Sequence, residues 1–136
     1  MATFNKFNSF VENLAEKAFN LGSDTLKVAL TNVLPVASNS VLANITEIDY
    51  TNCSSRALTI SSSAQTAGVY KLTIADLILS ATGGPLPTFR YIVIYDDTAT
   101  NDELICWFDY GTPLTLQETD TLTLDFDATN GLLQIT

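Results

Sequence analysis

The chain has 136 residues, 46% of them hydrophobic, which is enough for one globular domain with a core but not for two. Fifteen acidic and six basic residues give a net charge of -9, and the chain contains no histidine. The charge argues against nucleic acid as a partner, because phosphate binding needs clustered Lys and Arg. The lack of histidine excludes His-dependent nucleophilic triads and zinc sites built with histidine.

All of the net charge lies beyond Arg90. The first 90 residues carry six acids and six bases, whereas the last 46 residues carry nine acids and no base. An acidic region keeps a protein soluble and repels copies of the same surface. Two interpretations stand: an acidic third that faces solvent while the neutral part faces partners, or ordinary solvated strands and turns.

Charged residues interrupt the first twenty positions, which do not resemble a secretion signal, and no stretch reaches the roughly 18 apolar residues of a membrane span. We therefore expect a chain that is made and kept in the cytoplasm unless it leaves in a larger assembly, with no membrane partner. In that reducing compartment Cys53 and Cys106 are expected to be thiols rather than a disulfide.

A helix is predicted at about residues 4–21. Apolar residues recur there at three- and four-residue steps, and Gly22 follows as a stop signal. Phe19 falls outside this apolar stripe and needs a second burial partner. That partner is either a crease of the same domain or a neighbouring subunit, since aromatic side chains are favoured interface anchors.

Beyond Gly22 the hydrophobic pattern changes to a period of two. A short half-buried strand is predicted around Leu26–Leu30, followed by an irregular excursion at about 32–55 with one helical turn near Val41–Ile45. A hairpin is predicted on either side of Ala67–Gly68. The apolar runs 89–95 and 104–108 predict the central strands, joined by an acidic loop.

The end of the chain predicts a second hairpin, from Leu122–Phe126 to Leu132–Ile135, with a turn at 128–131. Short strands at this spacing with Thr-rich outer faces are typical of a mainly β fold. We expect a single domain over 1–136: an antiparallel β-sandwich or small barrel with one N-terminal amphipathic helix packed on it.

The only concentrated acidic motif is the loop between the two central strands. Its carboxylates suit calcium in composition, but the loop lacks the EF-hand glycine and flanking helices, so a solvated hairpin tip is the alternative. The candidate cation ligands are Asp96, Asp97, Asp102 and Glu103.

Two further kinds of site have candidate residues in the last third. A glycosidase needs two carboxylates on opposite sides of a sugar bond, which could come from Asp109, Asp125 and Asp127, although an outward-facing polar stripe would look the same. A sugar-binding surface needs exposed aromatic rings, although rings in apolar strands are more often core. The aromatic candidates are Tyr91, Tyr95, Trp107 and Tyr110. No motif demands an enzyme.

Several stretches of the chain resemble small virion structural proteins of tailed bacteriophages. They are Phe4-Asn5-Lys6-Phe7-Asn8, residues 21–32, Phe89-Arg90-Tyr91 running into Tyr95-Asp96-Asp97-Thr98, and residues 125–131. None of these stretches is a catalytic signature, and the resemblance implies a non-enzymatic role in the particle, without a cofactor.

The resemblance implies first a capsid cement or decoration protein on the head surface of the virion, which ties neighbouring capsomers together. The alternatives are a tail or fibre component and, in a different class, a carbohydrate-binding module. The implied partners are the major capsid protein and copies of the chain itself, as a homo-oligomer such as a trimer. The interface candidates are Phe4, Phe7, Phe19, Val41 and Ile45.

Overall fold

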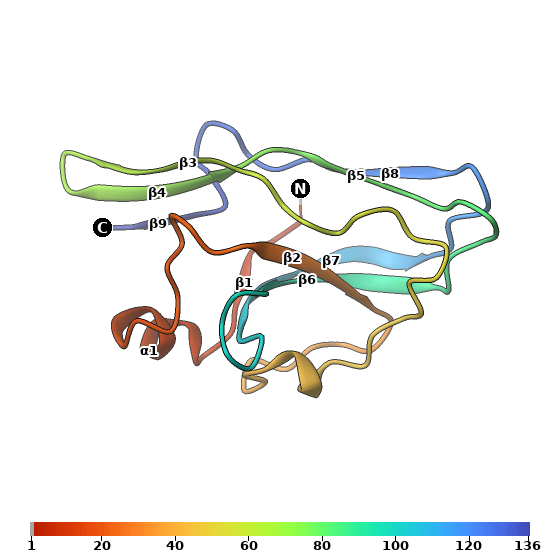
Figure 1. Ribbon diagram of the computed structural model, residues 1–136, viewed down its shortest axis with the longest axis horizontal. Helices are drawn as coiled ribbons and strands as arrows, with labels where there is room; N and C mark the ends of the chain where they lie inside the picture. The colour runs from red at the N-terminus through yellow and green to blue at the C-terminus, as the bar shows by residue number, and fades with distance from the viewer. Residues whose placement is uncertain (1) are drawn as a thin grey trace.

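Residues 2–136 are described by a computed structural model, in which antiparallel sheets and one short α-helix make up the fold (Figure 1). The elements are β1 (Asn5–Lys6), α1 (Phe10–Ala15), β2 (Leu26–Thr31), the 3-10 helix η1 (Leu42–Asn44), β3 (Ile60–Thr66), β4 (Val69–Ile74), β5 (Leu77–Ser80), β6 (Phe89–Asp96), β7 (Leu104–Leu114), β8 (Thr121–Leu124) and β9 (Leu133–Ile135). The prediction of a mainly β, antiparallel fold with a helix near the N-terminus is confirmed.

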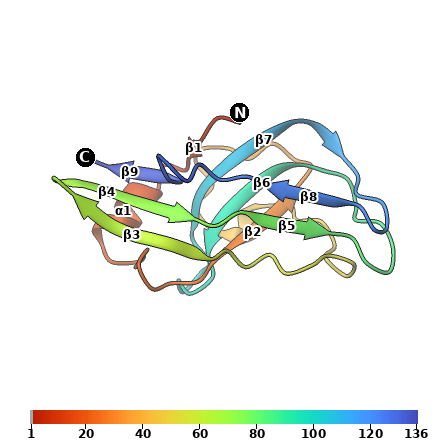
Figure 2. The same cartoon turned by 90° about the horizontal axis from the view of Figure 1, so that it is seen from above.

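The strands lie in two layers, seen edge-on in Figure 1 and from above in Figure 2. One layer is a four-stranded sheet in the order β1-β7-β6-β2. The other contains a three-stranded sheet, β3-β4-β9, and a two-stranded sheet, β5-β8. The main hydrophobic core draws on both layers and includes Leu30 and Ile94 from the first and Leu72 and Leu79 from the second. Neither layer closes on itself within the described residues.

Strand β6 is buried on both faces, as its uninterrupted apolar run predicts. Ile92 and Ile94 belong to the core between the layers, whereas Val93 and Tyr95 face the other way. The excursion covers that outer face: Ile45 joins Val93 and Tyr95 in a second, smaller core. The excursion is therefore a cover for the sheet, and the helical turn expected within it is present as η1.

The two predicted central strands, β6 and β7, are paired with each other and internal in their sheet. The predicted first hairpin is also present as β3 and β4. Ala67 and Gly68 both have positive φ angles, of 50° and 84°. Two consecutive positive φ values are the signature of the type I′ turn that matches the twist of paired strands.

The predicted C-terminal hairpin is wrong. Strand β8 pairs with β5, and β9 pairs with β4, so the last two strands do not pair with each other. The registers show that β8 and β9 run in one direction along the β4–β5 segment, interrupted by a loop at 125–132. The Asp127–Gly131 turn satisfies its own backbone groups, so the local sequence looks the same whether or not the flanking strands pair.

The predicted helix at 4–21 is much too long, because α1 has only six residues. At the start of the predicted helix, Asn5 and Lys6 form a strand that pairs with Trp107 and Cys106 of β7. Just after α1 ends, Lys17 adopts a left-handed φ of 68°. The Ala18 N–H donates to the Asn13 carbonyl at 2.8 Å, the long hydrogen bond of a Schellman motif, so the chain reverses well before Gly22.

Candidate functional site

Three large aliphatic residues that lie close together in the sequence, just after β2, have exposed side chains. Val33, Leu34 and Val36 are 56%, 60% and 57% exposed, and we call them the apolar tip. Pro35 between them is buried. Most of the large aliphatic side chains of the protein lie in the core, so an exposed cluster of three within four residues marks a candidate contact surface.

The backbone of the apolar tip is held by hydrogen bonds at both ends. The Val33 N–H donates to the Thr31 hydroxyl at 3.0 Å, and the Val36 N–H donates to the Asn39 side-chain carbonyl at 2.8 Å. The segment is also tied to the N-terminal region, because the Asn8 N–H donates to the Ala37 carbonyl at 2.9 Å. A segment ordered in this way loses little backbone conformational entropy when a partner buries its side chains.

The five interface candidates from the sequence divide into two groups. Phe7, Phe19 and Ile45 are buried inside the chain, with exposed fractions of 0%, 4% and 9%, so their side chains stabilise the fold and offer no surface to a partner. Phe4 and Val41 keep partial exposure. The sequence patterns did not identify the apolar tip as a candidate surface. The signal that could have identified it is a run of aliphatic residues inside an excursion rich in Asn, Ser and Pro.

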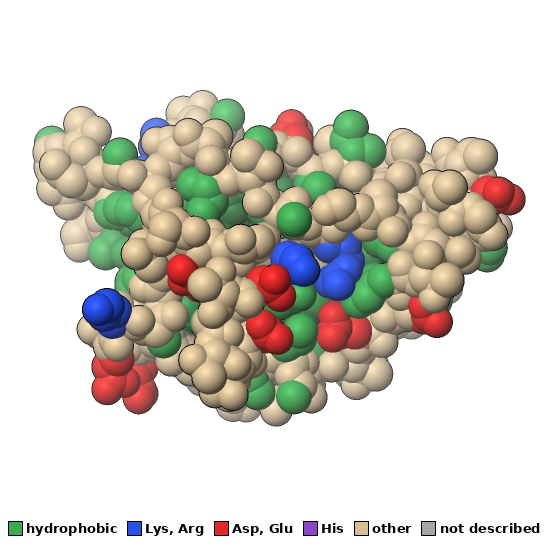
Figure 3. Space-filling model, viewed as in Figure 1, with side chains coloured by type: hydrophobic (Ala, Val, Ile, Leu, Met, Phe, Trp, Pro, Cys, Tyr) green, Lys and Arg blue, Asp and Glu red, His purple; other side chains and the backbone are tan. Residues whose placement is uncertain are grey.

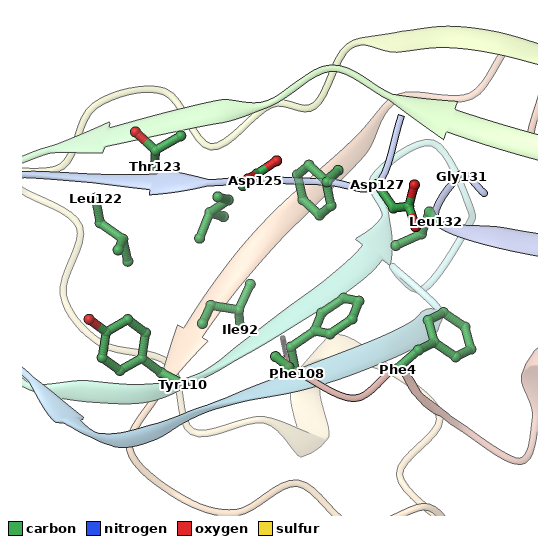
Figure 4. A pocket seen from close by; sticks show the side chains of 13 residues that line it. Phe4, Ile92, Phe108, Tyr110, Leu122, Thr123, Asp125, Asp127, Gly131 and Leu132 are labelled. Atoms are coloured by element: carbon green, nitrogen blue, oxygen red, sulfur yellow. The ribbon is translucent and has the colours of Figure 1, made fainter. Parts of the chain in front are cut away.

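A cleft of about 350 Å³ opens between β8 and the four-stranded sheet (Figure 4). Leu122 enters it from β8, and Ile92, Phe108 and Tyr110 enter it from β6 and β7. Phe4 closes one end, with its ring in an edge contact with Phe108 at 6.0 Å between centroids. Thr123 and Asp125 point to the opposite side of β8, so the interior is almost entirely apolar.

The three carboxylates considered for glycoside hydrolysis have other partners or positions. Asp109 forms a bidentate ion pair with Arg90, at 2.8 and 3.0 Å, and this guanidinium lowers the pKa of Asp109. Asp127 accepts the N–H groups of Thr129 and Asn130, which lowers its pKa as well. Asp109 does not line the cleft that Asp125 and Asp127 border, so the three do not frame one opening.

The four aromatic residues considered for sugar binding do not share a surface. Tyr91 and Tyr95 are buried, and Trp107 packs against Phe7 with ring centroids 4.7 Å apart. Only Tyr110 of the four is widely exposed. The rings therefore serve mainly as packing, in agreement with their position in apolar strands.

The acidic loop between β6 and β7 does not gather its carboxylates around one point. Asp97 pairs with Lys27 at 3.3 Å, and Glu103 accepts hydrogen bonds from Asn101. Within residues 2–136, no three Cys, Asp or Glu side chains converge in a way that could hold a metal ion. Of the four cation candidates, Asp96, Asp97 and Glu103 thus have partners within the protein.

Asp96 differs from the rest of that loop because its side chain is completely buried. Its Oδ1 accepts the N–H groups of Thr98 and Ala99, at 2.9 and 3.1 Å. The Asp24 side chain is within hydrogen-bonding reach of it. Burial, followed by the contact with Asp24, raises the pKa of Asp96 to about 7.

The acidic residues of the last third do not form a single face. The turn with Asp97 and Asp102 precedes β7, whereas Glu118 and Asp120 follow the other end of this 11-residue strand. Figure 3 shows acidic side chains scattered among basic and apolar ones on the face it presents. The acidic residues of the last third are therefore divided between the two ends of β7 and do not make up one continuous acidic surface.

No protein-family model, curated protein or solved structure matches this chain. Within residues 2–136, no helix combines the length and the apolar character needed to cross a membrane. Cys53 and Cys106 are both free thiols, as expected, and burial raises the pKa of each.

Proposed function

We propose that this chain is a non-enzymatic structural protein of a tailed bacteriophage particle, a capsid decoration protein that binds the head surface and stabilises contacts between capsomers. The resemblance of its N-terminal, central and C-terminal stretches to small virion proteins motivates the proposal. The structural observation that carries it is the apolar tip, a rigid hydrophobic surface presented outside the chain's own core. In this proposal the two strand layers form an open sandwich that supports the apolar tip.

The apolar tip suits a role in attachment on energetic grounds. Complete burial of a fully exposed Val or Leu side chain contributes about 1.5–3 kcal/mol. The three side chains of the apolar tip are 56–60% exposed, so burial of the remainder gives somewhat more than half of this for each, which is still a useful part of a binding free energy. Repetition over many symmetry-related positions on a shell raises the effective affinity further, because neighbouring attached copies add contacts to one another. The partners proposed are the major capsid protein and further copies of this chain.

The test is addition of the purified protein to phage heads that lack it. We expect saturable binding and a higher melting temperature of the heads. Leu34→Asp places a charge at the centre of the apolar tip and should abolish binding while the melting temperature of the free protein stays unchanged. Ile78→Asp is the matched control, because Ile78 is 59% exposed on strand β5, away from the tip, and should bind heads like the wild type.

Three outcomes would count against the head assignment. Absence of binding to heads, together with antibody labelling of the tail, would replace it with a tail or fibre component. Specific hits on a glycan array would replace it with a carbohydrate-binding module, and turnover of host surface polysaccharide would show an enzyme. If the Leu34→Asp variant still bound heads, the proposed function would stand, but the contact with the head would have to lie outside the apolar tip.

A further inference from the structure

One oxygen of Asp96 is buried without a hydrogen-bond donor. Asp96 is the last residue of β6, and its Oδ1 is fully engaged by the backbone of Thr98 and Ala99. Its Oδ2 is inaccessible to solvent and accepts no hydrogen bond from residues 2–136. A carboxylate in this environment is costly when ionised, whereas a protonated carboxyl has a donor of its own to share.

The neighbour that can share this proton is Asp24, which lies in the turn before β2. Asp24 is fixed in place because its Oδ2 accepts the Asn20 N–H at 2.8 Å. Two carboxyl groups in contact behave as a pair in which one proton is retained, since both cannot be ionised at low cost. The contact with Asp24 is one of the causes that raise the pKa of Asp96.

The other charged groups around this pair do not neutralise it. Lys27, the nearest base on β2, is paired with Asp97 at 3.3 Å. Asp102 and Glu103, just before β7, add negative charge, and Asp102 interacts with both Glu103 and Asp97. The pair therefore has a buried acceptor on one side and a mostly acidic turn on the other, which favours retention of a proton over ionisation.

The pair lies where two turns of the chain meet. The Asp97 N–H donates to the Thr25 carbonyl at 2.9 Å, and the Thr25 N–H donates to the Thr98 hydroxyl at 2.9 Å. Leu26 of β2 is directly opposite Asp96 in the sheet register. A change in the charge of Asp96 thus acts on the junction between residues 20–25 and the acidic turn 97–103.

We propose that the buried carboxyl of Asp96 retains a proton, which it donates to the Asp24 carboxylate, and that this contact is a pH-sensitive latch, which holds the acidic turn 97–103 against residues 20–25 and weakens as that proton is lost. This device does not depend on the proposed capsid role, and its test uses the free protein.

The direction of the pH effect follows from proton linkage. Asp96 has a raised pKa of about 7 in the closed structure, against about 4 for a solvated aspartate. Between these values the closed latch binds a proton that the open one has released, so rising pH favours opening. The opening equilibrium should increase about tenfold for each pH unit across this range and level off above it.

The direct test is a carbon NMR titration of the side-chain carboxyl groups in the wild-type protein. The Asp96 carboxyl should titrate close to neutral pH, and hydrogen exchange of the Asp97, Thr98 and Ala99 amides should show the expected rise in opening between pH 5 and 7, after correction for intrinsic rates. An Asp96 carboxyl that titrates near pH 4 would overturn the proposal, and so would opening that does not change with pH.

Asp96→Asn mimics the permanently protonated state, since its amide can donate to Asp24 while its carbonyl accepts the N–H groups of Thr98 and Ala99. Its melting temperature should match that of the wild type near pH 4.5 and exceed it at pH 8. Asp125→Asn is the matched control: it removes one exposed charge elsewhere and should follow the wild-type pH profile. An Asp96→Asn variant with the same pH profile as the wild type would also overturn the proposal, and the wild-type titration decides the question even if the variant fails to fold.

Discussion

The ring of Phe19 packs against that of Phe10, with centroids 5.7 Å apart and 31° between the planes, although the two residues lie on opposite sides of a helix end. The Schellman motif at Lys17 reverses the chain and brings Phe19 back over the first helical residue. Phe19 is thus a core residue of the N-terminal region, and its burial partner is within the same chain.

Phe19→Ala should lower the free energy of unfolding by about 3–5 kcal/mol, because it leaves a cavity next to Phe10. Chemical denaturation measures this loss. Val11→Ala, on the exposed side of the same helix, should cost less than about 0.5 kcal/mol. If Phe19→Ala weakened attachment to heads without affecting stability, Phe19 would be an interface residue after all.

Tyr50→Phe should destabilise the protein by about 1–3 kcal/mol, although it removes only one oxygen atom. The Tyr50 hydroxyl accepts the Leu30 N–H at 2.9 Å and donates to Glu47 at 2.8 Å, and the Arg56 guanidinium lies 3.7 Å from its ring centre. Phenylalanine would leave the Leu30 amide without its partner. Tyr110→Phe, at an exposed position, should have no measurable effect on the melting temperature, and equal losses in both variants would contradict this explanation.

Lys17→Gly should stabilise the protein by about 1 kcal/mol, since glycine adopts a left-handed conformation without the steric cost that a side chain brings. Lys17 has a φ of 68°, whereas the adjacent Glu16 has a φ of -93°. Glu16→Gly should therefore give no gain. Thermal unfolding of both variants provides the comparison, and stabilisation by Glu16→Gly alone would contradict the assigned helix end.

Gly131→Ala should destabilise the protein by about 1–3 kcal/mol or more, because a side chain there combines backbone strain with a steric clash. Gly131 has a φ of 76°, and a Cβ at this position would lie 2.5 Å from the Leu72 carbonyl oxygen. Gly22→Ala is the control, since its closest neighbour would be at 3.4 Å. Equal melting temperatures for the two variants would show that the loop at 125–132 does not approach β4 as closely as described.

Much of the β architecture could be predicted from local patterns. The apolar run at 89–95 indicates a strand buried on both faces, and β6 has that environment. The alternating segments on either side of Ala67–Gly68 indicate a hairpin, which is present as β3 and β4. Such features depend on neighbours in the sequence, and hydrophobic periodicity reports them directly.

The candidate site was much harder to predict. Val33, Leu34 and Val36 are exposed because the excursion covers the sheet with other residues, such as Ile45, and leaves these three outside. If the chain had followed a different path, the same aliphatic residues would have been buried in the core. Likewise, nothing in the sequence around Asp24 shows that it meets Asp96, since 71 intervening residues separate the two.

The sequence by itself determined the class of the fold, the central strands, the net charge and the absence of histidine, because these follow from composition and from period-two alternation. Only the tertiary structure decided that β8 and β9 join different partners, that Asn5 and Lys6 pair with β7 instead of starting a helix, that Phe19 is core and that one aspartate is buried beside another. Each of these depends on contacts between distant segments, and the free energy of such contacts cannot be inferred from either segment alone.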